Sequence, residues 1–192
     1  MSTDTRRRLT AEDRRRQLIG VGLRLLTTTP VHELSVDDVA AEVGISRSLL
    51  FHYFPTKTDY FRAVVRAAGD RFVAACSPDP ALPREQQLAA TVDGLIDFVE
   101  RRRENYLAFV LGAAADPVLQ EGTDEVRDKL VAAIMAALEL PESALAGLQV
   151  RGWLAYAQEL VVRWATHHEV SREELRDLLV DGLHKLLGPR RG

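Results

Sequence analysis

Cysteine is nearly absent from this sequence, which has a single one, Cys76, among 192 residues. A disulfide within the chain is therefore impossible, and we expect a reducing, cytosolic compartment. Long apolar runs are missing too, since no stretch reaches the roughly 18 uninterrupted apolar residues that a membrane span needs. The polar, basic start of the chain does not have the apolar segment of a secretory signal. The sequence thus excludes a disulfide scaffold and predicts no membrane partner.

Sequence signatures of common enzymes are also missing. There is no glycine-rich phosphate loop ending in Lys-Ser/Thr and no Gly-x-Ser-x-Gly nucleophile turn. Cys76 has no histidine near it in the sequence, and the adjacent His167 and His168 would point in different directions on a helix. We therefore expect no catalytic residue, no metal site and no cofactor, and an enzyme is the less favoured alternative.

The residues that are abundant point to an all-α protein with a substantial core. Leucine, alanine, arginine and glutamate, all good helix formers, dominate a chain that is 46% hydrophobic, and strand-like alternation is scarce. The net charge is −3, but residues 1–62 carry ten basic and eight acidic side chains, against fifteen and twenty in the remainder. This mild asymmetry is weak support for a nucleic-acid-binding N-terminal part.

Helix start and stop signals divide the chain into segments. Thr10 and Asp13 form a capping box, and Pro30 ends the helix that follows. Ser35 begins a short helix that Gly44 ends, and Ser46 begins a third that Pro55 ends. Further helices are expected over residues 56–76, 87–102, 105–114, 117–140, 141–166 and 171–188.

The first three helices have the layout of a helix-turn-helix. A tight turn at Val43-Gly44-Ile45 joins the second and third, Ala40 is small where they must cross, and Ile45 can fill the turn. In this arrangement the second helix of the pair enters the major groove of DNA. The sequence therefore predicts a flexible basic arm at 1–9, a helix-turn-helix domain at 10–54, a connecting helix at 55–76 and a regulatory domain at 77–192.

Residues 35–57 read SVDDVAAEVGISRSLLFHYFPTK and closely resemble the DNA-binding signature of the TetR family of bacterial regulators. The shared features are Val39-Ala40, the Gly44-Ile45-Ser46 turn, an aromatic cluster before Pro55 and the Thr56-Lys57 pair. The match covers about residues 16–65. The resemblance implies an N-terminal three-helix helix-turn-helix domain, followed by a helical domain that dimerises and binds a small molecule.

The resemblance also implies where DNA would be contacted. Arg47 is expected to read a guanine edge or hold a phosphate, with a solvated surface arginine as the alternative. Lys57 would hold a phosphate at a helix N-terminus. Tyr53 would either contact a phosphate or be a core tyrosine with its hydroxyl at the rim of the core. Phe51 has no hydroxyl where the family often has tyrosine. The expected DNA-binding set is Ser35, Arg47, Ser48, Leu49, His52, Tyr53 and Lys57.

Aromatic residues of the C-terminal part are candidates for a ligand pocket, although each could instead fill the core. The expected set is Phe72, Phe98, Tyr106, Phe109, Trp153 and Tyr156. The last two helices, about 143–166 and 172–187, carry more apolar residues than one helix pair needs, and we expect them to form a homodimer interface. The apolar residues concerned are Leu145, Leu148, Leu154, Ala155, Leu160, Val161, Trp164, Leu175, Leu178, Leu179, Leu183, Leu186 and Leu187.

The interpretation that follows is a DNA-binding transcriptional regulator, and on family grounds a repressor rather than an activator. It would leave a palindromic operator on double-stranded DNA when a small, largely hydrophobic effector binds. The alternative from another class is a helical ligand-binding or scaffold protein with no affinity for DNA.

Overall fold

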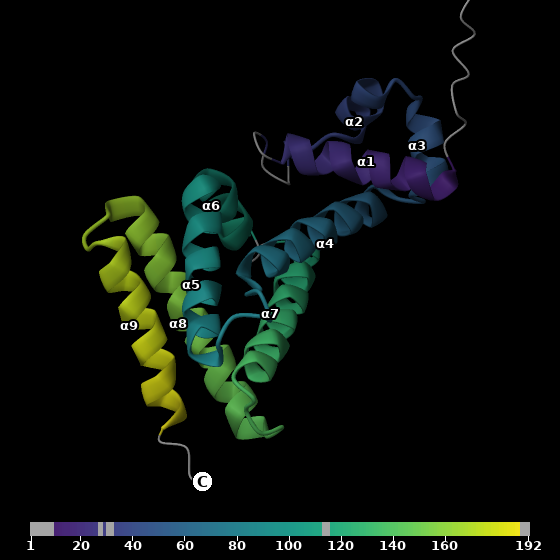
Figure 1. The fold of residues 1–192 in the computed structure, drawn as a ribbon. Helices are drawn as coiled ribbons and strands as arrows, with labels where there is room; N and C mark the ends of the chain where they lie inside the picture. Colours follow the sequence, from purple (N-terminus) through teal and green to yellow (C-terminus); the bar gives the residue numbers. More distant parts are fainter. Residues whose placement is uncertain (1–9, 27–28, 30–32, 113–115, 189–192) are drawn as a thin grey trace, which may run out of the picture. The chain divides into compact units, whose positions relative to one another are not determined.

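The expected all-α fold is confirmed. The computed structural model describes residues 10–26, 29, 33–112 and 116–188, and within these ranges the chain forms nine helices and no strand (Figure 1). The expected basic arm at 1–9 and Pro30 lie outside the described residues. The chain divides into two compact units, Met1–Ala67 and Ala68–Gly192, so the boundary falls within α4 (Lys57–Cys76). No helix in the described part of the chain is both long and apolar enough to cross a bilayer.

The first unit contains α1 (Ala11–Leu25), α2 (Val36–Val43), α3 (Arg47–Tyr53) and the beginning of α4. The capping box is present as expected, because the Thr10 hydroxyl accepts the Asp13 N–H at 3.1 Å and the Asp13 carboxylate accepts the Thr10 N–H at 3.4 Å. These two hydrogen bonds occupy the backbone N–H groups of Thr10 and Asp13, which have no partner within the helix. All four helices bury side chains in one small core, which includes Leu18, Val21, Val39, Leu50, Phe54, Tyr60 and Val64.

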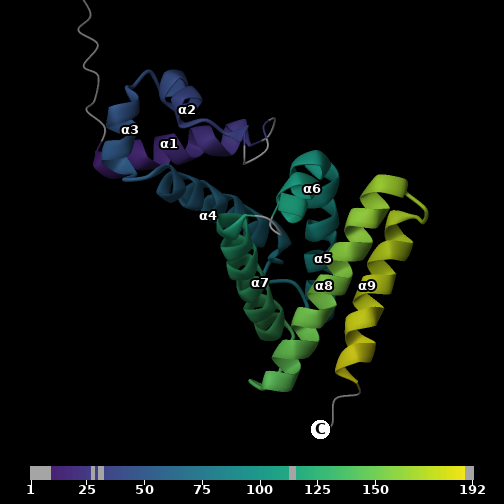
Figure 2. The ribbon, with the colours of Figure 1, turned by 180° about the vertical axis from the view of Figure 1, so that it is seen from behind.

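The second unit contains the rest of α4 and five further helices, α5 (Arg84–Arg101), α6 (Arg103–Gly112), α7 (Pro117–Ala137), α8 (Ala144–His167) and α9 (Arg172–Leu187). In Figures 1 and 2, α8 and α9 run antiparallel and side by side. A second capping box, between Ser171 and Glu174, begins α9 where the Ser171-Arg172-Glu173-Glu174 sequence favours a helix start. α5 begins three residues earlier than expected, directly after Pro83.

Some apolar residues of α8 and α9 face the core of their own unit, and others face solvent. The sequence pattern does not separate these two groups. Five of the residues assigned to a dimer interface are in fact buried in the core of their own unit: Val161, Trp164, Leu175, Leu179 and Leu183. Leu145 and Leu148 on α8 remain 67% and 66% exposed, and Leu178 and Leu186 on α9 remain 50% and 46% exposed. These five residues could not be separated from the exposed ones beforehand, because residue type alone does not say which side of a helix faces its neighbour.

Two glycines allow helices of the second unit to approach closely. A Cβ atom added at Gly94 on α5 would lie 2.1 Å from the carbonyl oxygen of Ala75 on α4. A Cβ added at Gly69 on α4 would lie 2.4 Å from a methyl carbon of Val126 on α7. Both distances are far below van der Waals contact. At Gly94 the obstacle is a backbone atom, whereas at Gly69 the Val126 side chain would have to shift.

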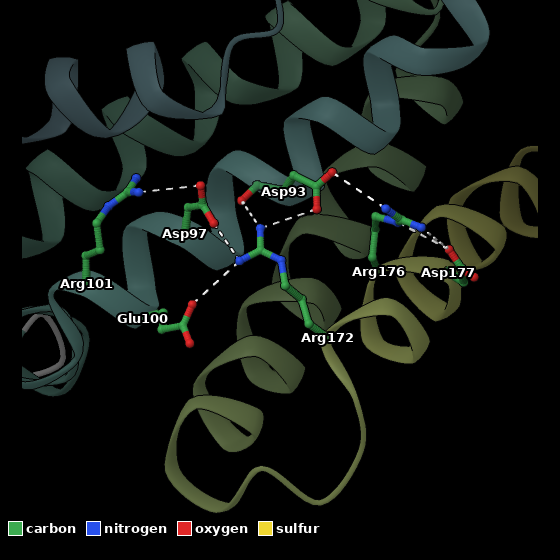
Figure 3. Close-up of polar contacts among 7 residues, drawn as sticks. All are labelled: Asp93, Asp97, Glu100, Arg101, Arg172, Arg176 and Asp177. Atoms are coloured by element: carbon green, nitrogen blue, oxygen red, sulfur yellow. Dashed lines mark hydrogen bonds and ion pairs between the residues drawn. The ribbon is translucent and has the colours of Figure 1, made fainter.

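A cluster of charged side chains joins α5 to α9 (Figure 3). The Arg172 guanidinium lies 2.6 Å from Asp97, 3.5 Å from Glu100 and 3.4 Å from Asp93, and Arg176 lies 4.0 Å from Asp93. Because these side chains are partly exposed, each pair contributes little free energy by itself. Their common geometry nevertheless favours one register of α9 along α5.

Replacing Gly94 with alanine should destabilise the protein. The new methyl group would meet a backbone oxygen that cannot rotate away, and overpacking of this kind costs about 1–3 kcal/mol. Gly147→Ala on α8 is the control, since nothing lies within 4 Å of its added Cβ and alanine should gain about 0.5–1 kcal/mol there. Urea unfolding followed by circular dichroism measures both. Equal stability of the two variants would contradict the close α4–α5 contact.

Candidate nucleic-acid interface

The turn between α2 and α3 has the geometry that its sequence predicts. Ser35 precedes α2, and its hydroxyl accepts the N–H of Asp37 at 3.1 Å. Gly44 ends the helix with φ 70° and ψ 37°, the left-handed conformation that glycine adopts without strain. The Ile45 N–H then donates to the Ala40 carbonyl at 2.9 Å, which closes the turn. The chain can therefore reverse direction over three residues and begin α3 at once.

The short helix α3 has one buried and one exposed side. Ser46 caps it by accepting the Leu49 N–H at 3.2 Å. Leu50 and, directly after the helix, Phe54 are fully buried. The residues expected to contact DNA lie elsewhere on the helix: Arg47, Ser48, Leu49 and His52 are exposed, and Tyr53 is half-buried. The structure thus places five of the seven expected residues on α3, four of them exposed.

The buried side of α3 is held by aromatic contacts with α1 and α4. The rings of Phe54 and Tyr60 meet edge to face at 5.1 Å, and the Tyr60 hydroxyl donates to the Leu18 carbonyl at 3.0 Å. Burial raises the pKa of Tyr60 well above its ordinary value, so the hydroxyl remains a donor. The Arg15 guanidinium lies 4.2 Å from the Phe54 ring centroid and donates to the carbonyl of Tyr53.

Lys57 is the first residue of α4, where the helix N-terminus favours anions. Thr56 and Asp59 form a reciprocal cap, with the Thr56 hydroxyl accepting the Asp59 N–H at 3.0 Å and the Asp59 carboxylate accepting the Thr56 N–H at 3.1 Å. The Lys57 ammonium is exposed and lies 5.0 Å from the centroid of the Phe61 ring. An exposed ammonium carries N–H donors that can bind an anion at this helix end.

Arg47 has a neighbour that the sequence analysis missed. Its Nη1 lies 2.7 Å from a carboxylate oxygen of Asp37, in the first turn of α2. Its guanidinium carbon lies 5.3 Å from the centroid of the Phe51 ring. No sequence signal identifies this pair, because ten residues and a turn separate the two side chains and only the packing of α2 against α3 brings them together.

The expected ligand-binding aromatics are partly gathered. Phe72 lies with its ring centroid 4.8 Å from Phe98 and 5.8 Å from Tyr106. Trp153 is buried and donates its indole N–H to the Leu179 carbonyl at 2.9 Å. Phe109 on α6 is half-buried, and Tyr156 on α8 is 42% exposed. A pocket lined by these six residues stays a prediction.

The thiol of Cys76 lies in the same region of the second unit. It is buried in the core, and burial raises its pKa to about 12. Burial also raises the pKa of Tyr106 well above its ordinary value, with a smaller contribution from Cys76. Both groups are therefore neutral at physiological pH, and the thiol has the properties of a structural cysteine.

Family models match both units of the chain. Residues 18–64 match the model described as bacterial regulatory proteins, tetR family, and residues 84–186 match a tetracyclin repressor-like C-terminal domain. The chain belongs to the TetR family. Members of this family are DNA-binding transcriptional regulators that act as dimers, not enzymes.

Individual TetR-family relatives agree with this assignment. A solved tetR-family transcriptional regulator from Streptomyces coelicolor is 30% identical with a TM-score of 0.76, over 93% of this chain and 82% of that one. The transcriptional regulator BetI of Escherichia coli is 30% identical over 113 residues, 55% of this chain and 58% of that protein. The transcriptional activator FasR of Mycolicibacterium smegmatis is 26% identical over 101 residues, 52% of this chain and 46% of that protein. The chain thus spans about half the length of these last two relatives.

Gly44→Ala should weaken the first unit, because a side chain in the left-handed conformation costs about 1 kcal/mol or more. Nothing lies within 4 Å of an added Cβ, so the loss would come from the backbone alone. Gly44→Asn is the matched control, because asparagine tolerates this conformation better. Thermal unfolding should therefore rank wild type above Asn and Asn above Ala, and an Ala variant as stable as the Asn variant would contradict this account.

Proposed function

We propose that this TetR-family chain is a sequence-specific repressor that inserts α3 into the major groove of a palindromic operator. The observation that carries the proposal is the two-sided character of α3. Leu50 and Phe54 attach the helix to its unit, while Arg47, Ser48 and Leu49 at its N-terminal end are exposed. Residues at this end of a recognition helix are the ones that reach base edges.

Different residues of this surface would make different kinds of contact. Arg47 is suited to the two acceptors of guanine, and the side chain of Leu49, 39% exposed, is suited to a thymine methyl group. Lys57, together with the N-terminus of α4, is suited to a phosphate, which positions the protein without reading sequence. Ser48, His52 and Tyr53 would add polar contacts to bases or phosphates. The Ser35 hydroxyl oxygen already accepts the Asp37 N–H as a helix cap. A phosphate contact by Ser35 would therefore use the same hydroxyl, as a donor.

A homodimer through α8 and α9 would account for the largest exposed apolar face. Of the seven exposed large hydrophobic side chains in the described residues, five lie on these two helices, namely Leu145, Leu148, Tyr156, Leu178 and Leu186. Tyr156 on α8 lies close to α9, since an added Cβ at Gly182 would lie 3.6 Å from the Tyr156 ring. A two-fold dimer fits an operator with half-sites one turn of DNA apart, about 34 Å.

The second unit is proposed to bind a small, largely hydrophobic effector near Phe72, Phe98 and Tyr106. Their ring contacts support a ligand with an apolar body. Phe72 lies on α4, the helix that also begins with Lys57, so a ligand that displaces Phe72 acts on the element that bears a DNA contact. Release requires that the ligand binds the two states of the protein unequally.

Arg47→Ala and Lys57→Ala should have different effects on DNA binding. Loss of Arg47 removes a base contact and should cost about 1–3 kcal/mol of discrimination at one base position. Loss of Lys57 should weaken binding to all duplexes alike. It should also reduce the slope of the log binding constant against log salt by about 1, because one fewer phosphate is neutralised. Gel shifts with the DNA beside the gene, at several salt concentrations, measure both, and Lys185→Ala on α9 controls for loss of charge. Unchanged affinity in both variants would refute the proposed contacts.

The protein should sediment at micromolar concentration as a dimer of about twice 21.4 kDa. Leu145→Glu combined with Leu148→Glu should convert it to a monomer, because charges would then face each other in a desolvated interface. Val170→Glu is the control, since Val170 is 47% exposed in the loop between α8 and α9. A wild-type monomer, or a double variant that remains dimeric, would exclude this interface.

A further inference from the structure

Arg47 is restrained from two sides before any DNA is present. The side chain of Arg47 is 59% exposed and that of Asp37 is 57% exposed, yet they make an ion pair at 2.7 Å. On another side the guanidinium lies over the Phe51 ring, with 5.3 Å between its carbon and the ring centroid. Both neighbours come from the helix-turn-helix itself, Asp37 from α2 and Phe51 from α3.

This ion pair contributes little to folding, because an exposed pair is worth about 0–1 kcal/mol. Its larger consequence concerns binding. A free arginine side chain has about 2 kcal/mol of rotamer entropy, part of which is lost when it contacts a partner. Holding the guanidinium in one orientation beforehand lowers that loss for any partner that accepts this orientation.

The carboxylate of Asp37 also selects which partner Arg47 can accept. A phosphate placed on this guanidinium would lie next to a second negative charge and would be repelled by it. A guanine edge is neutral overall and offers two acceptors. Only Nη1 of Arg47 donates to Asp37, so the remaining N–H donors of the guanidinium can form a bidentate contact with such an edge.

Lys57 provides the contrast within the same unit. Among the described residues its ammonium has the Phe61 ring beside it and no carboxylate at ion-pair distance. Its charge is thus available to a phosphate, whereas that of Arg47 is already balanced.

We propose that Asp37 is a positioning residue that sets base specificity, by holding Arg47 for a guanine edge and excluding phosphate from it. The inference rests on the proposed function, in which the N-terminal end of α3 reads DNA. Asp37 itself touches no base in this scheme and acts through Arg47. The same carboxylate makes random DNA a poorer competitor for the protein.

The test uses the full-length protein and a library of random-sequence duplexes. Selection with the wild type identifies its preferred site, and binding is then measured for that site and for a shuffled duplex of the same composition. Asp37→Asn should reduce the ratio of the two affinities about five- to tenfold. This is only a part of the discrimination that a bidentate base contact gives, because Arg47 itself is still present. Its binding to the shuffled duplex should strengthen, and the slope against log salt should steepen by about 0.9, because Arg47 becomes free to neutralise one phosphate.

Asp38→Asn is the matched control. Asp38 is the next residue in the first turn of α2 and is exposed, so its replacement removes the same charge from the same helix end without touching Arg47. It should leave the affinity ratio and the salt slope of the wild type unchanged. In an Arg47→Ala background, Asp37→Asn should have no further effect on the ratio, and thermal unfolding should show that all variants are folded.

The outcomes separate the inference from the function on which it rests. If the wild type enriches no sequence, sequence-specific binding itself is refuted, and the role of Asp37 with it. If the wild type enriches a site but Asp37→Asn keeps the same affinity ratio, or changes it equally with and without Arg47, then only the positioning role is refuted.

Discussion

The burial of one side of α3 is the constraint on which the proposed recognition surface depends. A helix of seven residues is not stable alone in water, so α3 depends on the burial of Leu50 and Phe54. Phe54 contacts Arg15 of α1 and Tyr60 of α4. The Tyr60 hydroxyl, bonded to the Leu18 carbonyl, joins α4 to α1 beneath it. Whatever orients Leu50 and Phe54 inward also orients Ser48 and His52, on the opposite side of α3, toward solvent, and Arg47 is exposed at the N-terminal end of the helix.

Charge in this unit acts through its placement rather than its sum. The whole chain carries a net charge of −3, and an acidic residue, Asp37, lies against Arg47, the arginine that we propose reads a base. An overall negative chain can still bind DNA if its cations are concentrated on one face. In the proposed scheme the carboxylate of Asp37 improves selectivity, because its negative charge disfavours the phosphate contacts that every duplex offers.

The second unit uses α8 and α9 for two purposes at once. Trp153 and Leu179, joined by a hydrogen bond of 2.9 Å, face the unit's own core, while Leu148 and Leu178 lie on the exposed side. The Arg172 cluster favours one register of α9 along α5, which also sets the position of that exposed side. A dimer formed there would therefore be sensitive to the packing of the core that Trp153 and Leu179 belong to.

Local interactions within three or four residues are what the sequence by itself determined. The capping boxes at Thr10 and Ser171, the left-handed turn at Gly44 and the helix-turn-helix could all be predicted, because each depends on neighbouring residues and on the conformational freedom of glycine. Tertiary structure alone decided the Asp37–Arg47 pair and which leucines of α8 and α9 remain exposed. These depend on the rotation and crossing of packed helices, which residue type and periodicity do not specify.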